Sequence, residues 1–215
     1  MRKILLISPH FDDAVLSAGQ YMADRPDCEV VTVFAGTPAN PDKLKTPYDE
    51  KCGFDNARDA VGTRIRENEQ ALALLEATSI NLEFCDSQYS QYVGMADILH
   101  KLQNIIDSSD YEMIMAPLGL GHPDHLMVTD AVIRLNTEKP IWLWEDLPLR
   151  VVEPQLVWGR IATLGLANKE VMQHSTTGDK MAKKIRSMLC YKSQVGTGIL
   201  DPYLMYVPER FWKYQ

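Results

Sequence analysis

KILLISPHFDD, residues 3–13, is the stretch from which the fold of this chain can be inferred. Ile4–Ile7 is a continuous apolar run, which is typical of a buried strand. One imidazole and two adjacent carboxylates, His10, Asp12 and Asp13, follow this run at once. A strand that ends in this way delivers polar side chains to the carboxyl edge of a sheet, where open parallel sheets build their functional sites.

Short apolar runs recur along the chain and alternate with segments of helical spacing. The runs predict strands over Lys3–Ile7, Glu29–Phe34, Asn81–Phe84, Glu112–Ala116 and Ile141–Trp144. The helical segments are Ala14–Ala23, Arg58–Ala77, Met95–Ile106 and His125–Leu135. This alternation predicts an α/β fold with three layers, α/β/α, built on a Rossmann-like, doubly wound and mostly parallel sheet.

Composition is typical of a folded globular protein, with 215 residues of which 46% are apolar and 24% charged. No shift in composition marks a boundary, so we expect a single domain over residues 1–215. The net charge of −7 argues against nucleic acid as a partner, because nucleic-acid affinity depends on clustered Lys and Arg. The first apolar run is too short for a signal peptide or a membrane span, so we expect a cytoplasmic protein without membrane contact.

Three segments fit the alternation less clearly. Gly36–Asn56 is rich in turn-forming pairs and predicts a long irregular loop, either a lid beside the site or a mobile insertion. We expect Gln155–Leu166 to be extended and Lys180–Tyr191 to be helical. The aromatic and basic segment Arg210–Tyr214 is expected to dock on the body of the protein or in a subunit contact, which leaves a homo-oligomer open.

A second polar cluster, Gly121-His122-Pro123-Asp124-His125, follows the strand predicted at Glu112–Ala116. Catalytic zinc commonly takes three protein ligands from His and carboxylate side chains and keeps a fourth position for water. His10 and Asp13 are three residues apart across a turn, so both can face one point. The third ligand must come from another strand end, and His125, at the start of the helix predicted after the strand Glu112–Ala116, can supply it.

Hydrolysis by a metal-activated water also needs a base that lies close to the metal without binding it. Asp12 suits this role, although spacing alone does not settle which of Asp12 and Asp13 binds the metal. His122 lies near the start of a helix that Pro123 would begin, and it could stabilise an oxyanion or protonate a leaving amine. The competing interpretation of His122 is a purely structural histidine.

These residues resemble a known family, the LmbE-like or PIG-L deacetylases, which include the de-N-acetylase of GlcNAc-phosphatidylinositol and the mycothiol- and bacillithiol-pathway deacetylases. The family's first motif, His-Pro-Asp-Asp-Glu, corresponds to His10–Ala14, and its second, His-Pro-Asp-His, is intact at His122–His125. A weaker pattern, Arg-x-x-Glu-x-x-x-Ala, is matched over Arg66–Ala73. Tyr191–Gln194 is similar to a late Ser-Gln segment of the family.

The resemblance implies an LmbE-like fold and a zinc-dependent N-deacetylase. Its reaction would hydrolyse an N-acetylglucosamine-type amino sugar conjugate, a small molecule, to acetate and a free amine. By this resemblance the metal ligands are His10, Asp13 and His125. Asp12 is the general base, and His122 stabilises the oxyanion.

Three further residues are expected to contact the substrate. Phe11 departs from the family motif and would reshape the pocket wall near the metal. Arg66 could bind a substrate hydroxyl or phosphate through its planar fork of donors, unless it is a solvated helix residue. Asp146 directly follows the strand Ile141–Trp144 and should point to the same sheet edge as the metal, unless it only shapes the turn before Pro148.

Two other functions stay open at this stage. Two histidines and one carboxylate also form the site of non-haem Fe(II) oxygenases, which makes Fe²⁺ the alternative metal. Such oxygenase sites usually belong to all-β barrels, which argues against that function by fold analogy. A non-catalytic metal- or glycan-binding module could use the same ligands, but it needs neither a base such as Asp12 nor an oxyanion partner such as His122.

Overall fold

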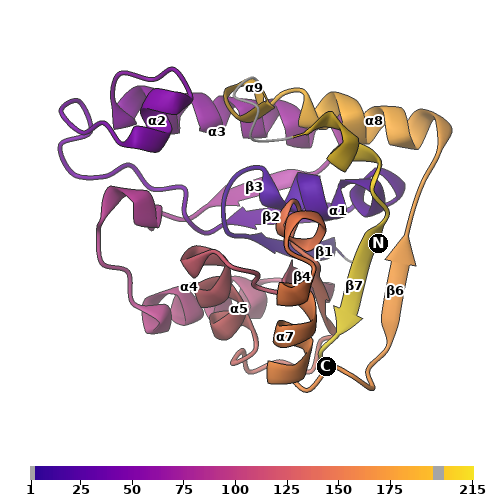
Figure 1. The fold of residues 1–215 in the computed structure, drawn as a ribbon. Coiled ribbons are helices and arrows are strands. Elements are labelled where there is room, and N and C mark those ends of the chain that lie inside the picture. The colour runs from indigo at the N-terminus through magenta and orange to yellow at the C-terminus, as the bar shows by residue number, and fades with distance from the viewer. Residues whose placement is uncertain (1–2, 196–200) are drawn as a thin grey trace.

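The computed structural model describes residues 3–195 and 201–215, and within them it forms one seven-stranded sheet with helices on both faces (Figure 1). The strands are β1 Lys3–Ser8, β2 Cys28–Thr32, β3 Thr78–Asn81, β4 Tyr111–Pro117, β5 Ile141–Trp144, β6 Val171–His174 and β7 Glu209–Lys213. Their order in the sheet is β3-β2-β1-β4-β5-β7-β6. The first five pair in parallel and β7 is antiparallel to both its neighbours, so the predicted mostly parallel α/β sheet is confirmed.

Helices cover the two faces of the sheet in separate groups (Figure 1). One face carries α1 Asp13–Asp24, α3 Ala57–Leu74 and α8 Gly178–Met188. The other carries α4 Met95–Ser108, α5 Pro123–Val132 and α7 Gln155–Thr163. The short elements are α2 Pro47–Lys51, α6 Leu149–Val152, α9 Lys192–Val195 and the 3₁₀ helices η1 Ser87–Tyr89 and η2 Pro202–Tyr206.

Strand β1 shows why its sequence is continuously apolar. Ile4 and Leu6 belong to the core on the α1 side of the sheet, whereas Leu5 and Ile7 belong to the core on the α4 and α5 side. All four are fully buried. Successive side chains of a strand point to opposite faces, so a strand with a helix layer on each face needs apolar residues at every position.

The strand order contains the switch point expected of a doubly wound sheet. The chain moves outward from β1 through β2 to β3 and then returns to β4 on the opposite side of β1. Ligands bind such sheets in the crevice at the carboxyl ends of the strands on either side of the switch. The two polar clusters follow β1 and β4, so the topology brings both to this crevice.

The strand predicted at Asn81–Phe84 is wrong, because the edge strand β3 runs over Thr78–Asn81 instead. β3 pairs with β2 alone, and Thr78 and Ser79 are exposed on it. An edge strand with little burial carries no apolar run. The apolar residues Leu82 and Phe84 follow β3 and pack against the core, and the segment between them makes an isolated bridge from Glu83 to Phe34 and does not continue the strand.

The carboxy-terminal third contains one error and two confirmed predictions. Gln155–Leu166 is not extended: most of it forms α7, in which the buried Val157 and Ile161 lie four residues apart on one helix face. Lys180–Tyr191 is mostly helical, as α8. Arg210–Tyr214 docks on the body of the protein as the greater part of β7, which lies between β5 and β6.

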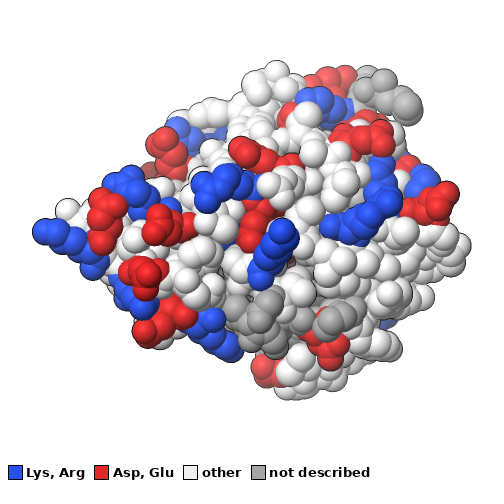
Figure 2. Space-filling view, turned by 90° about the horizontal axis from the view of Figure 1, so that it is seen from above, with Lys and Arg blue, Asp and Glu red and all other residues white. Residues whose placement is uncertain are grey.

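In the described part of the chain, no helix combines the length and the apolar character that crossing a bilayer requires. On the face seen in Figure 2, Lys and Arg side chains are interspersed with Asp and Glu and do not gather into one patch of a single sign. The single domain over residues 1–215 and the homo-oligomer stay predictions.

A buried ion pair ties β7 to helices of one face. Lys184 Nζ on α8 lies 2.8 Å from Glu209 Oε1 on β7, and both side chains are fully buried. Glu209 also accepts the backbone N–H groups of Gln20 and Tyr21 on α1, at 2.7 and 2.9 Å. Lys184 donates in addition to the carbonyl of Leu16 at 2.9 Å. These contacts satisfy both charges and fix α1 against β7 and α8.

Replacing Lys184 by Met should lower the free energy of unfolding by about 3–5 kcal/mol, because Glu209 stays buried without its charge partner. Lys183→Met is the matched control, since its ammonium pairs with Glu76 at the surface, where an ion pair contributes about 0–1 kcal/mol. Urea unfolding followed by circular dichroism measures both variants. Equal losses of stability would show that the buried pair is not the anchor of β7.

Candidate metal centre

The turn after β1 is shaped by hydrogen bonds that present His10 and Asp13. Ser8 Oγ accepts the N–H of Ala14 at 3.0 Å and donates to the carbonyl of His10 at 2.6 Å. The N–H of His10 donates to Asp13 Oδ2 at 2.8 Å. The first polar cluster is therefore held between the end of β1 and the start of α1.

The turn between β4 and α5 presents the second cluster. His122 caps α5, with Nδ1 accepting the N–H of Asp124 at 3.2 Å, and Pro123 is the first helical residue, as predicted. The chain reaches this helix through Gly119, whose φ is +81°. A Cβ at Gly119 would lie 2.6 Å from Thr129 Oγ1, so this tight turn needs glycine on both grounds.

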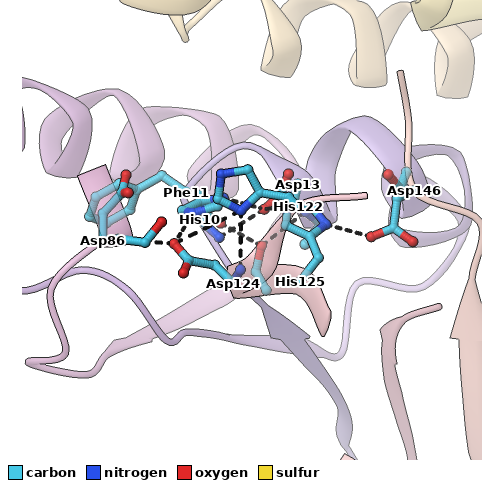
Figure 3. A network of polar contacts seen from close by, with 12 residues as sticks. His10, Phe11, Asp13, Asp86, His122, Asp124, His125 and Asp146 are labelled. Atoms are coloured by element: carbon cyan, nitrogen blue, oxygen red, sulfur yellow. Dashed lines mark hydrogen bonds and ion pairs between the residues drawn. The ribbon is translucent and has the colours of Figure 1, made fainter. Parts of the chain in front are cut away.

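His10, Asp13 and His125 converge on one point (Figure 3). Asp13 Oδ2 lies 3.1 Å from His10 Nδ1 and 3.2 Å from His125 Nε2. One donor atom from each residue lies within 4.8 Å of the other two, so together they could hold a metal ion. The set of two imidazoles and one carboxylate suits Zn²⁺, and it suits Fe²⁺ as well.

Each of these imidazoles also contacts an outer carboxylate through its second nitrogen. His10 Nε2 lies 3.0 Å from Asp124 Oδ2, and His125 Nδ1 lies 2.5 Å from Asp146 Oδ1. Figure 3 shows Asp146 beyond His125, on the side away from His10. Metal-binding histidines usually have such partners, which fix the orientation of the ring. The outer carboxylates leave His10 Nδ1 and His125 Nε2 facing Asp13.

The outer carboxylates are themselves fixed by backbone groups. Asp146 Oδ2 accepts the N–H of Gly119 at 3.0 Å, and Asp124 Oδ2 accepts the N–H of Ser87 at 3.1 Å. Both side chains are buried. The sequence did not assign a role to Asp124, although it lies inside the intact motif His122–His125.

A second group, His10, His122 and Asp124, also brings donor atoms within 4.8 Å of one another. It shares His10 with the first group. Asp124 Oδ2 already accepts the N–H of Ser87, and His122 is the partly exposed cap of α5. His10, Asp13 and His125 form the more enclosed set, and we take them as the candidate centre.

The neighbouring carboxyl groups of Asp12 and Asp13 differ in acidity. Burial, together with the charge of Asp13, raises the pKa of Asp12 to about 6. Burial opposes ionisation of Asp13 too, but the charge of His125 and hydrogen bonds from His10 and His125 outweigh it and hold the pKa of Asp13 well below its usual range. Surroundings that raise the pKa of one carboxyl group and lower the pKa of its neighbour are typical of sites in which the two groups have different roles.

A cavity of about 460 Å³ opens at the centre. Asp12 and His122, the two catalytic candidates that are not predicted to bind the metal, line it together with Phe11. Asp12 occupies the N-cap position of α1, but its side chain makes no capping hydrogen bond. The ring of His122 lies 5.0 Å from that of His10, centroid to centroid. Burial, with His10 and His125 nearby, lowers the pKa of His122, which favours the neutral imidazole.

Asp146 is fully buried behind His125 and is not among the described residues that line the cavity. The sequence correctly placed it at the carboxyl edge of the sheet, next to the candidate metal-binding residues. Its carboxylate is occupied by the imidazole of His125 and the N–H of Gly119, so the structure gives it an orienting contact in place of the expected substrate contact.

Arg66 also lies away from the cavity, since it is exposed on α3 and donates to Thr63 Oγ1 at 3.0 Å. The pattern Arg-x-x-Glu-x-x-x-Ala fits this helix in two registers, and the other one starts at Arg64 and continues through Glu67 to Ala71. These three residues are buried, and Arg64 lines the cavity. Burial therefore favours the register that starts at Arg64 over the predicted match at Arg66, Glu69 and Ala73, which are exposed.

The late segment Tyr191–Gln194 packs on α3 beside the site. The Tyr191 hydroxyl lies 3.0 Å from the carbonyl of Phe11, within the turn that carries Asp12. Ser193 donates to the Glu67 carboxylate through both its N–H, at 2.9 Å, and its hydroxyl, at 2.6 Å. The segment thus supports the turn after β1 and adds Tyr191 and Gln194 to the cavity lining.

A family model described as GlcNAc-PI de-N-acetylase, PIG-L, matches residues 5–136. The chain belongs to the PIG-L family. The matched range contains both polar clusters, so the resemblance inferred from them is confirmed.

This PIG-L chain is 26% identical over 186 residues to the 2'-N-acetylparomamine deacetylase of Niallia circulans, covering 68% of this chain and 67% of that protein. The deacetylase of the pseudoaglycone of A40926, an antimicrobial reagent, has a known structure and is 26% identical to this chain. Its TM-score is 0.79, and the match covers 98% of this chain and 96% of that one. Teicoplanin deacetylase, solved in a zinc-inhibited form, has a TM-score of 0.81 at 24% identity, covering 98% and 97%. The predicted LmbE-like fold is confirmed.

Replacing Asp146 by Asn should lower the affinity for Zn²⁺ by about 10- to 100-fold. Gly119 N–H and His125 Nδ1 contact different oxygens of Asp146, and Asn replaces one of them by an NH2 group, which cannot accept, so one contact is lost and the ring of His125 loses its fixed orientation. Competition with a chromophoric chelator measures the affinity. Asp130→Asn, on the same helix as His125 but paired with Arg160, is the control and should bind Zn²⁺ as the unsubstituted protein does. Equal Zn²⁺ affinities of the two variants would show that Asp146 does not orient His125 for metal binding.

Proposed function

We propose that this chain is a metal-dependent hydrolase that removes the N-acetyl group from an N-acetylglucosamine-type amino sugar conjugate, a small molecule. The observation that carries the proposal is the convergence of His10, Asp13 and His125 at a cavity that Asp12 and His122 also line. Membership of the PIG-L family supports it. So do the names of two relatives at 26% identity, a 2'-N-acetylparomamine deacetylase and a pseudoaglycone deacetylase.

Zn²⁺ is the proposed metal, with Fe²⁺ as the alternative for the same donors. His10 Nδ1, Asp13 Oδ2 and His125 Nε2 would hold it. When bound, such a metal polarises an amide carbonyl and lowers the pKa of a water molecule. The outer carboxylates Asp124 and Asp146 keep the two imidazoles oriented toward it.

Asp12 acts as the general base in this proposal. It adjoins Asp13 in sequence and lines the same cavity, and its carboxylate is not used to cap α1. It therefore takes a proton from the attacking water and delivers a proton to the departing nitrogen, so that acetate and a free amine leave. The proton that Asp12 removes from water ends on the amine, and the second proton of the water leaves with acetic acid, which ionises to acetate by passing it to the amine or to solvent.

His122 stabilises the oxyanion of the tetrahedral intermediate. Its Nδ1 accepts the N–H of Asp124, so the proton of the neutral ring lies on Nε2. An Nε2–H donor that is already positioned by a helix cap can bind a developing negative charge without reorganisation. For substrate binding we propose Phe11, which lines the cavity, and Arg64 in place of Arg66.

Replacing Asp12 by Asn should leave Zn²⁺ bound and lower the rate of amine release by about 10²- to 10⁴-fold, because the general base is lost. Asp13→Asn is the matched comparison one residue away and should lose Zn²⁺ affinity together with activity. Amine release from N-acetylglucosamine conjugates and the bound Zn²⁺ are measured on the same samples. Turnover retained by Asp12→Asn would exclude it as the base.

The same samples separate the two other functions. An oxygenase would consume oxygen with Fe²⁺ and release no amine. A binding module would bind the glycan without acetate release when Zn²⁺ is present in excess. Either result would overturn the proposed hydrolase.

A further inference from the structure

The cavity has one wall whose residues, apart from Arg64, have no role in the function proposed so far. Tyr48 on α2, Val61 and Arg64 on α3, and Tyr89 on η1 all line the cavity. The guanidinium carbon of Arg64 lies 5.3 Å from the centre of the Tyr48 ring, and Tyr89 packs in one cluster with Val61. We call these four residues the aromatic wall. It presents two phenol rings, an aliphatic side chain and a planar guanidinium to the same space.

The aromatic wall is held in place by contacts from the long loop 36–56. Thr46 Oγ1 donates to Gln88 Oε1 at 2.6 Å, next to Tyr89. The hydroxyl of Tyr48 donates to Gln194 Oε1 across the cavity. The loop therefore contributes a fixed part of the cavity through α2, which favours its interpretation as a lid beside the site over that of a mobile insertion.

The positive charge of the aromatic wall is already paired with a carboxylate, which bears on the class of ligand that the wall can bind. Arg64 pairs with the fully buried Asp49 at 2.9 Å, so its charge already has a partner. The carboxyl side chains that line the cavity in the described part of the chain are those of Asp12, Asp13 and Asp86. A phosphate next to this wall would lie beside these carboxyl groups, and the Arg64 guanidinium already has its carboxylate partner. A flat, uncharged group suits the wall better, because it can stack on the phenol rings.

The space is large enough for such a group. Cavities of about 300–1,000 Å³ hold ligands of drug size, and this one has about 460 Å³. The metal centre occupies one side of it, with the ring of Phe34 6.0 Å from that of His10. A sugar whose acetamido group reaches the centre can extend its substituent toward Tyr48 and Tyr89.

We propose that the aromatic wall binds an uncharged aromatic aglycone, so that the preferred substrates are aryl conjugates of an N-acetylated amino sugar and not phosphorylated ones. The proposal rests on the proposed deacetylation at the metal centre. It assigns to Tyr48 a direct contact with the aglycone.

Three probes test the preference: the phenyl glycoside, the methyl glycoside and the 1-phosphate of N-acetylglucosamine. Amine release in the presence of Zn²⁺ gives kcat/KM for each. The phenyl glycoside should exceed the methyl glycoside by about tenfold, the value of one stacked ring. The 1-phosphate should be the poorest of the three.

Variants of Tyr48 connect this preference to the wall. Tyr48→Ala should reduce the phenyl-to-methyl ratio to near one, and Tyr48→Phe should keep it. Tyr48→Leu fills the space without a ring, so it should lower the ratio even if Tyr48→Ala fails to fold. Tyr92→Ala is the matched control, since Tyr92 is 95% exposed, and it should leave the ratio unchanged.

A ratio near one in the unsubstituted protein, a ratio that survives in both Tyr48→Ala and Tyr48→Leu, or a preferred 1-phosphate would overturn the proposal. It would also be overturned if the ring-removing variants changed selectivity between N-acetyl and N-butyryl groups instead, because the wall would then face the acyl side. If no probe releases amine, the proposed function fails by itself. Calorimetric binding of the phenyl glycoside to the unsubstituted protein and to Tyr48→Leu then decides the inference about the wall.

Discussion

A single carboxylate oxygen, Oδ2 of Asp13, joins the two halves of the site. It accepts the N–H of its own turn at His10 and lies 3.1 Å from His10 Nδ1 and 3.2 Å from His125 Nε2. His10 lies in the turn that follows β1, and His125 lies at the start of α5, more than a hundred residues later. Such a contact requires β1 and β4 to be neighbours, which the switch in strand order provides.

The surroundings of Asp13 are rigid for reasons that lie far from the site. Asp13 begins α1, and the same helix donates the N–H groups of Gln20 and Tyr21 to the buried Glu209. Lys184 balances that charge from α8. The ion pair therefore fixes the helix that presents the central carboxylate, so stability and site geometry depend on shared contacts.

Sequence reasoning succeeded where local pattern and tertiary position agree. The run Ile4–Ile7 is buried on both faces, and the clusters at His10–Asp13 and His122–His125 lie at strand ends, so the alternation of strands and helices was enough to bring them together. Sequence reasoning failed where the same local pattern fits more than one set of residues. The pattern on α3 fits two registers, and only packing shows that Arg64, and not Arg66, faces inward. The partner of Asp146 is 21 residues away, and nothing local indicates that His125 occupies it.

The division between strands and loops also explains how chemistry and selectivity can vary separately. The ligands and the candidate base follow β1 and β4, where the sheet fixes the backbone and leaves little freedom for change. Tyr48 and Tyr89 come from α2 and η1, in connections that tolerate substitution and insertion without disturbing the sheet. Relatives at about a quarter identity can keep one fold while their names specify different conjugates. The residues that distinguish this chain's substrate are therefore expected in the loop 36–56 and at Phe11, and not among the candidate metal-binding residues.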